Sequence, residues 1–232
     1  EKRHFLSIGE TYATVIAEPK YVAAAEAEIQ AQRKLLENYI AAHPDFRDTL
    51  EPWHPEEDAP EIVRRMSKAA STFFLGPMAA VAGTLAGYAL EAMRVAGAPH
   101  VLIDNGGDIA MFIQRPVVVG LYTGDPVSSG LGLRFQPTGR VTAVCTSSAR
   151  VGPSLSFGKA DAAVVIAPDA SLADAAATAL GNAVTGGSQE MLSSALKGIF
   201  REGITGALAV AEGSLAAVGE IPEICRAEID LE

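Results

Sequence analysis

The chain has 232 residues, a formal net charge of −10 and a hydrophobic content of 49%. That content is enough for a sizeable core, so the sequence predicts a globular protein. The acidic charge argues against a protein that binds nucleic acid, because such binding depends on lysine and arginine side chains that neutralise phosphates. We therefore expect no nucleic-acid partner.

Cysteine usage and hydropathy indicate the cellular setting. The only two cysteines, Cys145 and Cys225, have a spacing that fits neither a zinc site nor a disulfide framework, so both are interpreted as reduced thiols. No apolar run approaches the ~20 residues that span a bilayer, and the first residues lack a signal-peptide apolar region. These features predict a cytoplasmic protein with no membrane partner, although a chain that opens on Glu1 leaves room for a removed leader.

Runs of alternating or continuous apolar residues predict strands, and runs rich in helix formers predict helices. The predicted strands are residues 3–8, 12–18, 100–105, 108–114, 116–123, 130–136, 140–147, 161–168 and 206–211. The predicted helices are residues 20–43, 61–71, 76–97, 171–182 and 189–203. A proline-rich and acidic loop follows the first helix, where Trp53 is expected to dock on the core. The last residues are expected to form a short tail.

This order of elements predicts an α+β fold. Strands so close together in sequence favour antiparallel pairing, with the long helices laid on one face of the sheet. No linker or internal repeat divides the chain, so residues 1–232 are expected to form a single domain. The apolar helix at 76–97 carries small residues, which predicts tight packing between other elements.

Asp174 and Thr178 are four residues apart in a predicted helix, so their oxygens emerge from the same face. Two hard oxygens side by side could serve a divalent cation. The alternative is structural: with Ser171 as the N-cap, Asp174 lies in the first helical turn, where an acid favours the helix dipole. Neighbouring alanines leave this face open to another group. The pair is a candidate metal site.

Two loops are candidates for ligand binding. In the corner from Asp104 to Asp108, Gly106 and Gly107 allow a tight turn between strands, or the close approach of main-chain N–H groups to a ligand held by Asn105 and Asp108. The second loop, residues 146–162, is long and polar, which is typical of a binding loop or of a merely solvated one. Its candidate binding residues include Thr146, Ser147 and Ser148.

Four ordered segments together resemble the ApbE-like superfamily, whose characterised members are FAD:protein FMN transferases. These segments, which span residues 76–182, are "GPMAAVAG", "LIDNGGDIA", "VCTSS" and "LADAAATALGN". The likeness is strongest to a divergent, uncharacterised branch, and it implies a T-fold-like antiparallel sheet backed by helices. It also implies that Asp174 and Thr178 bind Mg²⁺ with a main-chain carbonyl from near Ala79 or Ala80. The "GGD" corner would border a flavin dinucleotide.

The sequence also departs from the transferases. The segment after the threonine-serine motif lacks their usual histidine, and the first motif lacks their usual lysine-glycine pair. The departures favour binding of metal and nucleotide over FMN transfer. Three hypotheses stay open: a Mg²⁺-dependent enzyme acting on FAD or a similar pyrophosphate, a noncatalytic flavin- or nucleotide-binding protein, and an assembly subunit that forms a homo-oligomer.

Overall fold

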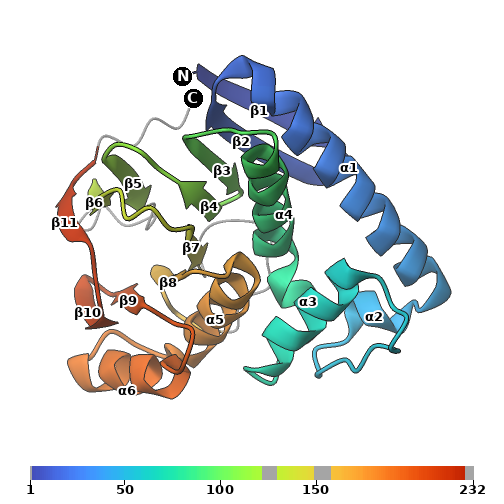
Figure 1. The fold of residues 1–232 in the computed structure, drawn as a ribbon. Helices are drawn as coiled ribbons and strands as arrows, with labels where there is room; N and C mark the ends of the chain where they lie inside the picture. The colour runs from blue at the N-terminus through green and yellow to red at the C-terminus, as the bar shows by residue number, and fades with distance from the viewer. Residues whose placement is uncertain (1, 122–129, 149–157, 228–232) are drawn as a thin grey trace.

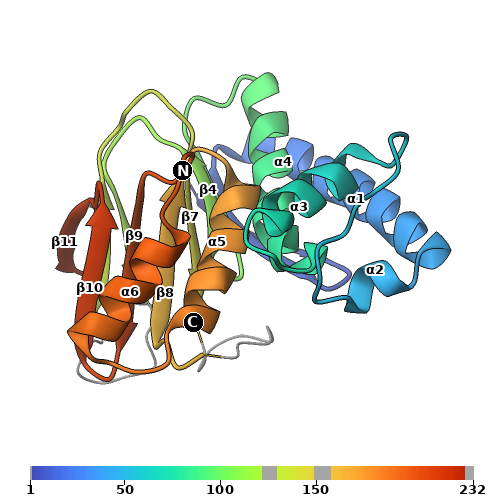
Figure 2. The ribbon, with the colours of Figure 1, turned by 90° about the horizontal axis from the view of Figure 1, so that it is seen from below.

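The computed structural model describes residues 2–121, 130–148 and 158–227 and contains an eight-stranded, fully antiparallel main sheet. In the order in which they lie across this sheet, the strands are β1 (Lys2–Ile8), β2 (Thr11–Ala17), β3 (Val101–Asn105), β4 (Asp108–Phe112), β7 (Thr142–Ser147), β8 (Ala162–Ala167), β9 (Gly206–Ala211) and β10 (Ser214–Gly219). The long helices cover one face of this sheet, as Figures 1 and 2 show. The predicted α+β class is confirmed.

The helices pack against the sheet through a large hydrophobic core. In chain order they are α1 (Pro19–Ala42), α2 (Asp45–Asp48), α3 (Glu61–Ser71), the 3-10 helix η1 (Pro77–Ala80), α4 (Val81–Val95), α5 (Ala170–Ala183) and α6 (Gln189–Ile199). Among the described residues, no helix is both long enough and apolar enough to cross a membrane. The sequence predicted a single helix at 76–97, whereas the structure has the 3-10 helix η1 followed by α4.

A second, three-stranded sheet covers the opposite face of the main sheet. Its order is β11 (Glu223–Arg226), β6 (Leu131–Phe135) and β5 (Val117–Leu121), and all of its pairs are antiparallel. A second hydrophobic core of aliphatic and aromatic residues lies between the two sheets. The sequence predicted β5 and β6 as strands but treated the residues after 211 as a short tail, and the structure corrects this: that tail contains β10 of the main sheet and β11 of the second sheet.

Two local predictions have different outcomes. Trp53 does dock on the core, where its indole N–H donates to the Tyr39 hydroxyl at 3.0 Å and its ring meets Phe46 edge-on. Ser171, however, does not cap α5. The N-cap is Asp169, whose carboxylate accepts from the backbone N–H groups of Ser171 and Leu172, so the helix begins one residue earlier than the predicted boundary.

Candidate functional site

Three polar side chains from neighbouring strands form a row on the helix-covered face of the main sheet. The register places Asn105 of β3 opposite Asp108 of β4, and Asp108 opposite Cys145 of β7. Residues directly opposite in antiparallel strands project to the same face. Cys145 belongs to the helix-side core, which identifies that face. This row is the floor of the candidate site.

The glycine corner that joins β3 to β4 is a tight turn. Gly106 and Gly107 have φ angles of 70° and 99°, values that favour glycine over any residue with a Cβ. The Asp104 carboxylate accepts the Gly107 N–H at 2.8 Å and closes the turn. The Asn105 amide donates to the Ala82 carbonyl at 3.0 Å, which ties the corner to the first turn of α4. The predicted corner is therefore fixed against a helix start.

The side chain of Asp174, a residue of α5, reaches the N-terminus of α4. Its carboxylate accepts the Gly83 N–H, in the first turn of α4, at 2.8 Å, and the side chain is 8% exposed. Gly83 is required for this approach, because a Cβ there would lie 2.4 Å from the Ala170 carbonyl oxygen. The sequence suggested that Asp174 favours the dipole of its own helix. In the structure it caps α4 instead, where backbone N–H groups favour negative charge.

Asp108 and Asp174 interact electrostatically, and we call them the carboxyl pair. Burial, aided by the charge of Asp104, raises the pKa of Asp108 to about 7, opposed by its interaction with the Cys145 side chain and by the Thr146 backbone N–H. Burial, followed by the charge of Asp108, raises the pKa of Asp174 well above its ordinary value, against the backbone N–H groups of Gly83 and Ala82. Two interacting carboxyls with raised pKa values favour sharing a proton or binding a cation over carrying two bare charges.

Cys145 is a neutral neighbour of the carboxyl pair. Burial, together with the charges of Asp108 and Asp174, raises the pKa of its thiol well above the ordinary value. The thiol donates to the Ala170 carbonyl at 3.6 Å. A protonated thiol is a poor ligand for a hard cation, so the oxygens of the site are the better donors. Cys145 is fully buried in the helix-side core.

The helical register of α5 extends the site beyond the carboxyl pair. Asp174, Thr178 and Gly181 lie along one side of the helix, because positions three, four and seven apart share a face. Gly181 comes close to Ser147: a Cβ on that glycine would lie 2.9 Å from the Ser147 hydroxyl. Thr178 is half-buried between these two contacts. The structure therefore brings Asp174, Thr178 and Ser147 to one interface between α5 and β7.

The other predicted residues are less closely grouped. Strand alternation places Thr146, which pairs with Val164 of the second core, on the face opposite to Asp108. Ser148 directly follows β7 and is half-buried. The remainder of the predicted binding loop falls partly on residues 149–157, which lie outside the described residues. Among the described residues, no three His, Cys, Asp or Glu side chains converge to hold a metal.

The segment "GPMAAVAG", residues 76–83, contains η1 and borders the candidate site beside α5. Ala79 lies in η1, which packs against α5, and is half-buried. The neighbouring Ala80 carbonyl already accepts the Thr84 hydroxyl. Of the two carbonyls that the sequence left open, Ala79 is therefore the better candidate, since that of Ala80 already has a side-chain partner in α4.

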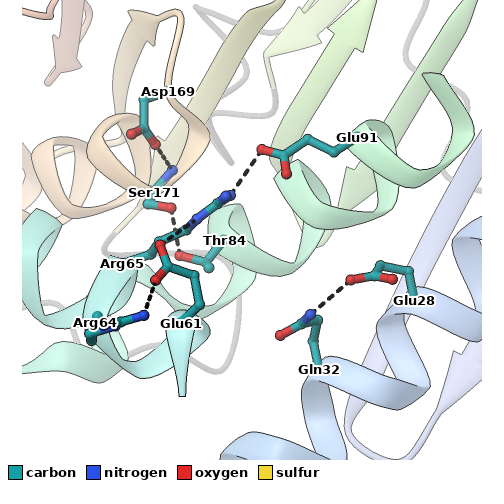
Figure 3. A network of polar contacts seen from close by, with 9 residues as sticks. All are labelled: Glu28, Gln32, Glu61, Arg64, Arg65, Thr84, Glu91, Asp169 and Ser171. Carbon is teal, nitrogen blue, oxygen red and sulfur yellow. Dashed lines mark hydrogen bonds and ion pairs between the residues drawn. The ribbon is translucent and has the colours of Figure 1, made fainter. Parts of the chain in front are cut away.

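Polar contacts hold α3, α4 and α5 together around this site (Figure 3). The Thr84 and Ser171 hydroxyls are hydrogen-bonded at 2.8 Å between α4 and α5, and both residues are buried. Arg65 of α3 pairs with Glu61 of its own helix at 3.4 Å and with Glu91 of α4 at 2.9 Å. The sequence gave no signal for the two contacts between helices, Thr84 with Ser171 and Arg65 with Glu91, because their partners lie far apart along the chain.

A cavity of about 500 Å³ opens between α5, α6 and the segment after α3. Its lining includes Phe73, Phe74, Ala179, Met191 and Arg201. Ala179 is five positions after Asp174, so it lies on a different side of α5 from the carboxyl pair. The cavity is thus separate from the candidate site.

Known proteins resemble this chain in sequence and in fold. The UPF0280 protein of Methanosarcina barkeri is 48% identical over 100% of this chain and 91% of its own length, and that of Archaeoglobus fulgidus is 42% identical over 94% and 92%. The apo flavinyl transferase ApbE of Pseudomonas stutzeri has a TM-score of 0.54 at 13% identity, over 94% of this chain and 93% of its own. A variant of the Vibrio cholerae flavin transferase ApbE has a TM-score of 0.54 at 11% identity, over 94% and 97%.

The two solved structures share the fold, and the sequence comparisons identify the family. The predicted resemblance to a divergent, uncharacterised branch of the ApbE-like superfamily is confirmed. Since the sequence model described as "AbpE bacteria" matches residues 1–198, the chain belongs to that ApbE-like family.

Proposed function

We propose that the chain binds a flavin nucleotide such as FAD, or a related pyrophosphate, together with Mg²⁺, at the junction of the glycine corner, η1, α4 and α5. The observation that carries this proposal is the carboxyl pair. Asp108 of β4 and Asp174 of α5 interact electrostatically, Asp174 accepts a backbone N–H at the start of α4, and burial raises the pKa of both carboxyls. A site that holds two carboxyls at such a cost to ionisation favours a cation.

The donor set fits Mg²⁺. The candidate ligands are the Asp174 carboxylate, the Thr178 hydroxyl and the Ala79 carbonyl, and all three are the hard oxygens that this ion prefers. Mg²⁺ is commonly held by one or two carboxylates plus substrate phosphates, so a site with few protein ligands suits a pyrophosphate-bound ion. When bound, the ion would supply charge stabilisation at the pyrophosphate.

The chain's own residues would position the ligand. The Asn105 amide is held by the Ala82 carbonyl, so the corner is fixed relative to α4 before any ligand arrives. Gly106 and Gly107 leave the main chain of the corner free of Cβ atoms, which permits close approach of a polar group. Because its pKa is raised to about 7, the Asp108 carboxyl can hold a proton near neutral pH and release it to solvent when a cation binds nearby. Ser147 borders the same interface from β7.

The proposal separates binding from catalysis. The departures from the transferase motifs remove a histidine and a lysine, which favours a noncatalytic flavin- or nucleotide-binding protein as the second candidate. Two outcomes distinguish the candidates when the protein is incubated with FAD and Mg²⁺. Chromatography of the mixture detects the products. Release of AMP or FMN indicates a flavin transferase or pyrophosphate hydrolase, whereas retention of intact FAD indicates a binding protein.

One substitution tests the site. Asp174→Asn keeps an oxygen that can accept the Gly83 N–H but removes the negative charge, so the fold should persist while Mg²⁺-dependent FAD affinity falls at least about tenfold. The control is Asp169→Asn, at the N-cap of the same helix, which should bind as wild type does. Calorimetric titration with FAD in Mg²⁺ and in EDTA gives the affinities. Wild-type protein that binds no FAD, or an Asp174→Asn protein that binds it equally well, would refute the proposal.

The compartment belongs to the same proposal. Cys145 and Cys225 are both free thiols, which agrees with a cytoplasmic protein. Fractionation of cells that produce the protein tests this placement, and recovery in an exported fraction would contradict it.

A further inference from the structure

The two edges of the main sheet differ in how they are protected. At the β10 edge, the Gln189 side chain of α6 donates to the Leu215 carbonyl at 3.1 Å, and Gly219 ends the strand with a φ of 75°. Side chains that occupy edge carbonyls, and kinks that end a strand, are common ways to prevent pairing with another chain. The β10 edge is therefore blunted.

In the part of the chain that the structure describes, the β1 edge has neither device. Among the described residues, β1 pairs with β2 alone along all seven of its residues, and it contains no proline or glycine. Phe5, at the centre of β1, is 74% exposed, and Tyr12 of β2 is 69% exposed. A long unpaired strand beside exposed aromatic rings is a template for the addition of another strand.

We infer that β1 pairs antiparallel with β1 of a second copy of the chain, about a two-fold axis at Phe5. Phe5 is the middle residue of Lys2–Ile8, so this register alone pairs the strand along its full length. It places Lys2 opposite Ile8, Arg3 opposite Ser7, His4 opposite Leu6, and Phe5 opposite its own counterpart. The pairing is closed, because the same surface is used by both copies.

The side chains fit this arrangement. The two Phe5 rings become a cross-strand aromatic pair on the face that the helices leave uncovered, a type of contact that stabilises antiparallel sheets. Tyr12 is opposite Ser7 within one copy, so it flanks the new contact on the same face. Leu6 and Ile8 project to the other face, where they pack against the helix-side core of their own copy. The main sheet would then continue across the axis.

Charge selects the direction of pairing. The chain as a whole is acidic, with a net charge of −10, but β1 begins with Lys2 and Arg3. Antiparallel pairing brings these cations toward the hairpin turn of the other copy, where Glu10 is exposed. Parallel pairing would instead place Lys2 beside Lys2 and Arg3 beside Arg3, which is repulsive. The antiparallel arrangement is therefore favoured electrostatically.

A cysteine at the axis tests the register. In antiparallel strands, directly opposite Cα atoms are about 4.5–5.5 Å apart, within the range that a disulfide bridges. In a Cys225→Ser background, Phe5→Cys should form a covalent dimer on mild oxidation, seen by non-reducing electrophoresis. Ser7→Cys, which would face Arg3 rather than itself, should remain uncrosslinked. Equal crosslinking of both, or of neither, would overturn the proposed register.

Sedimentation equilibrium of the full chain tests self-association itself. We expect a dimer whose dissociation constant rises at least about tenfold in Phe5→Glu, because two like charges would meet at the axis. Phe74→Glu is the matched control: Phe74 is 80% exposed and lies outside β1, so its replacement should leave the dimer unchanged. A monomer at all concentrations, or a dimer that Phe5→Glu leaves intact, would overturn the inference.

Discussion

The two faces of the main sheet bury different chemistry. The face toward β5, β6 and β11 encloses a core of aliphatic and aromatic side chains, such as Met111 and Leu133. The helix-covered face has a larger hydrophobic core, yet it also buries Asp174, beside Asp108 and Cys145. A buried hydrophobic side chain contributes to stability, whereas a buried ionisable group costs free energy unless it is paired. The contrast is between one face whose buried side chains are apolar and one that also carries the carboxyl pair of the proposed site.

Truncation on the small-sheet side should have the largest effect on stability. Leu133 of β6 is fully buried, so Leu133→Ala should lower the free energy of unfolding by about 3–5 kcal/mol. Urea unfolding gives this value. Val118→Ala, in neighbouring β5 but 39% exposed, should cost much less. If the two faces are independent, the folded fraction of Leu133→Ala should keep its Mg²⁺-dependent FAD affinity, and a loss of affinity would break the comparison.

The carboxyl pair should give the helix side a distinct pH dependence. Burial raises the pKa of Asp108 to about 7, so the folded state binds this proton more tightly than the unfolded chain does. Its contribution is complete at about pH 4 and is lost as the pH rises through about 7. As the pH rises from 4 to 8, Asp108→Asn should therefore become more stable than wild type. The difference in the free energy of unfolding should grow by roughly 2–4 kcal/mol over this range. Parallel stability profiles for the two proteins, measured without Mg²⁺, would contradict the assignment.

The contact between α4 and α5 should tolerate no added methyl group at Gly83. A Cβ there would lie 2.4 Å from the Ala170 carbonyl oxygen and 2.7 Å from the Asp174 Cβ, so Gly83→Ala should cost about 2–3 kcal/mol. Gly87→Ala is the control on the same helix. Its Cβ would lie 3.6 Å from the Ala170 Cβ, an ordinary contact, so better helix propensity should make it neutral or stabilising. Equal thermal stability of the two variants would refute the close-approach argument.

Local patterns in the sequence predicted the elements but not what covers them. Apolar runs bounded by turn residues identified β5 and β6 as strands, yet such runs cannot distinguish a strand of the main sheet from one of a second sheet. The strand β11 is four residues long and mostly exposed, so it lacks a clear apolar signal. Its pairing depends on β6, which is distant in sequence.

The candidate site shows the same limit. The spacing of Asp174 and Thr178 follows from the helical period, so the sequence could place them on one face of α5. The bond from Gly83 to Asp174 joins residues 91 positions apart, and no local pattern contains it. The nearness of Asp108 to Asp174 likewise depends on how α5 lies across β4 and β7. Thus the residue types were readable from the sequence, whereas their electrostatic coupling required the fold.

The smallest predicted effect concerns the hydroxyl pair between α4 and α5. Thr84 and Ser171 are buried and hydrogen-bonded at 2.8 Å, so Ser171→Ala should lower the free energy of unfolding by about 1 kcal/mol. Thr84→Val should cost somewhat more, because it also removes the hydrogen bond to the Ala80 carbonyl. Because both substitutions remove the same bond, the double variant should cost less than the sum of the two, and chemical denaturation of all four proteins measures this coupling. If the losses in free energy of unfolding are strictly additive, the hydroxyl pair contributes nothing, and α4 and α5 are held together by the Gly83–Asp174 contact and apolar packing alone.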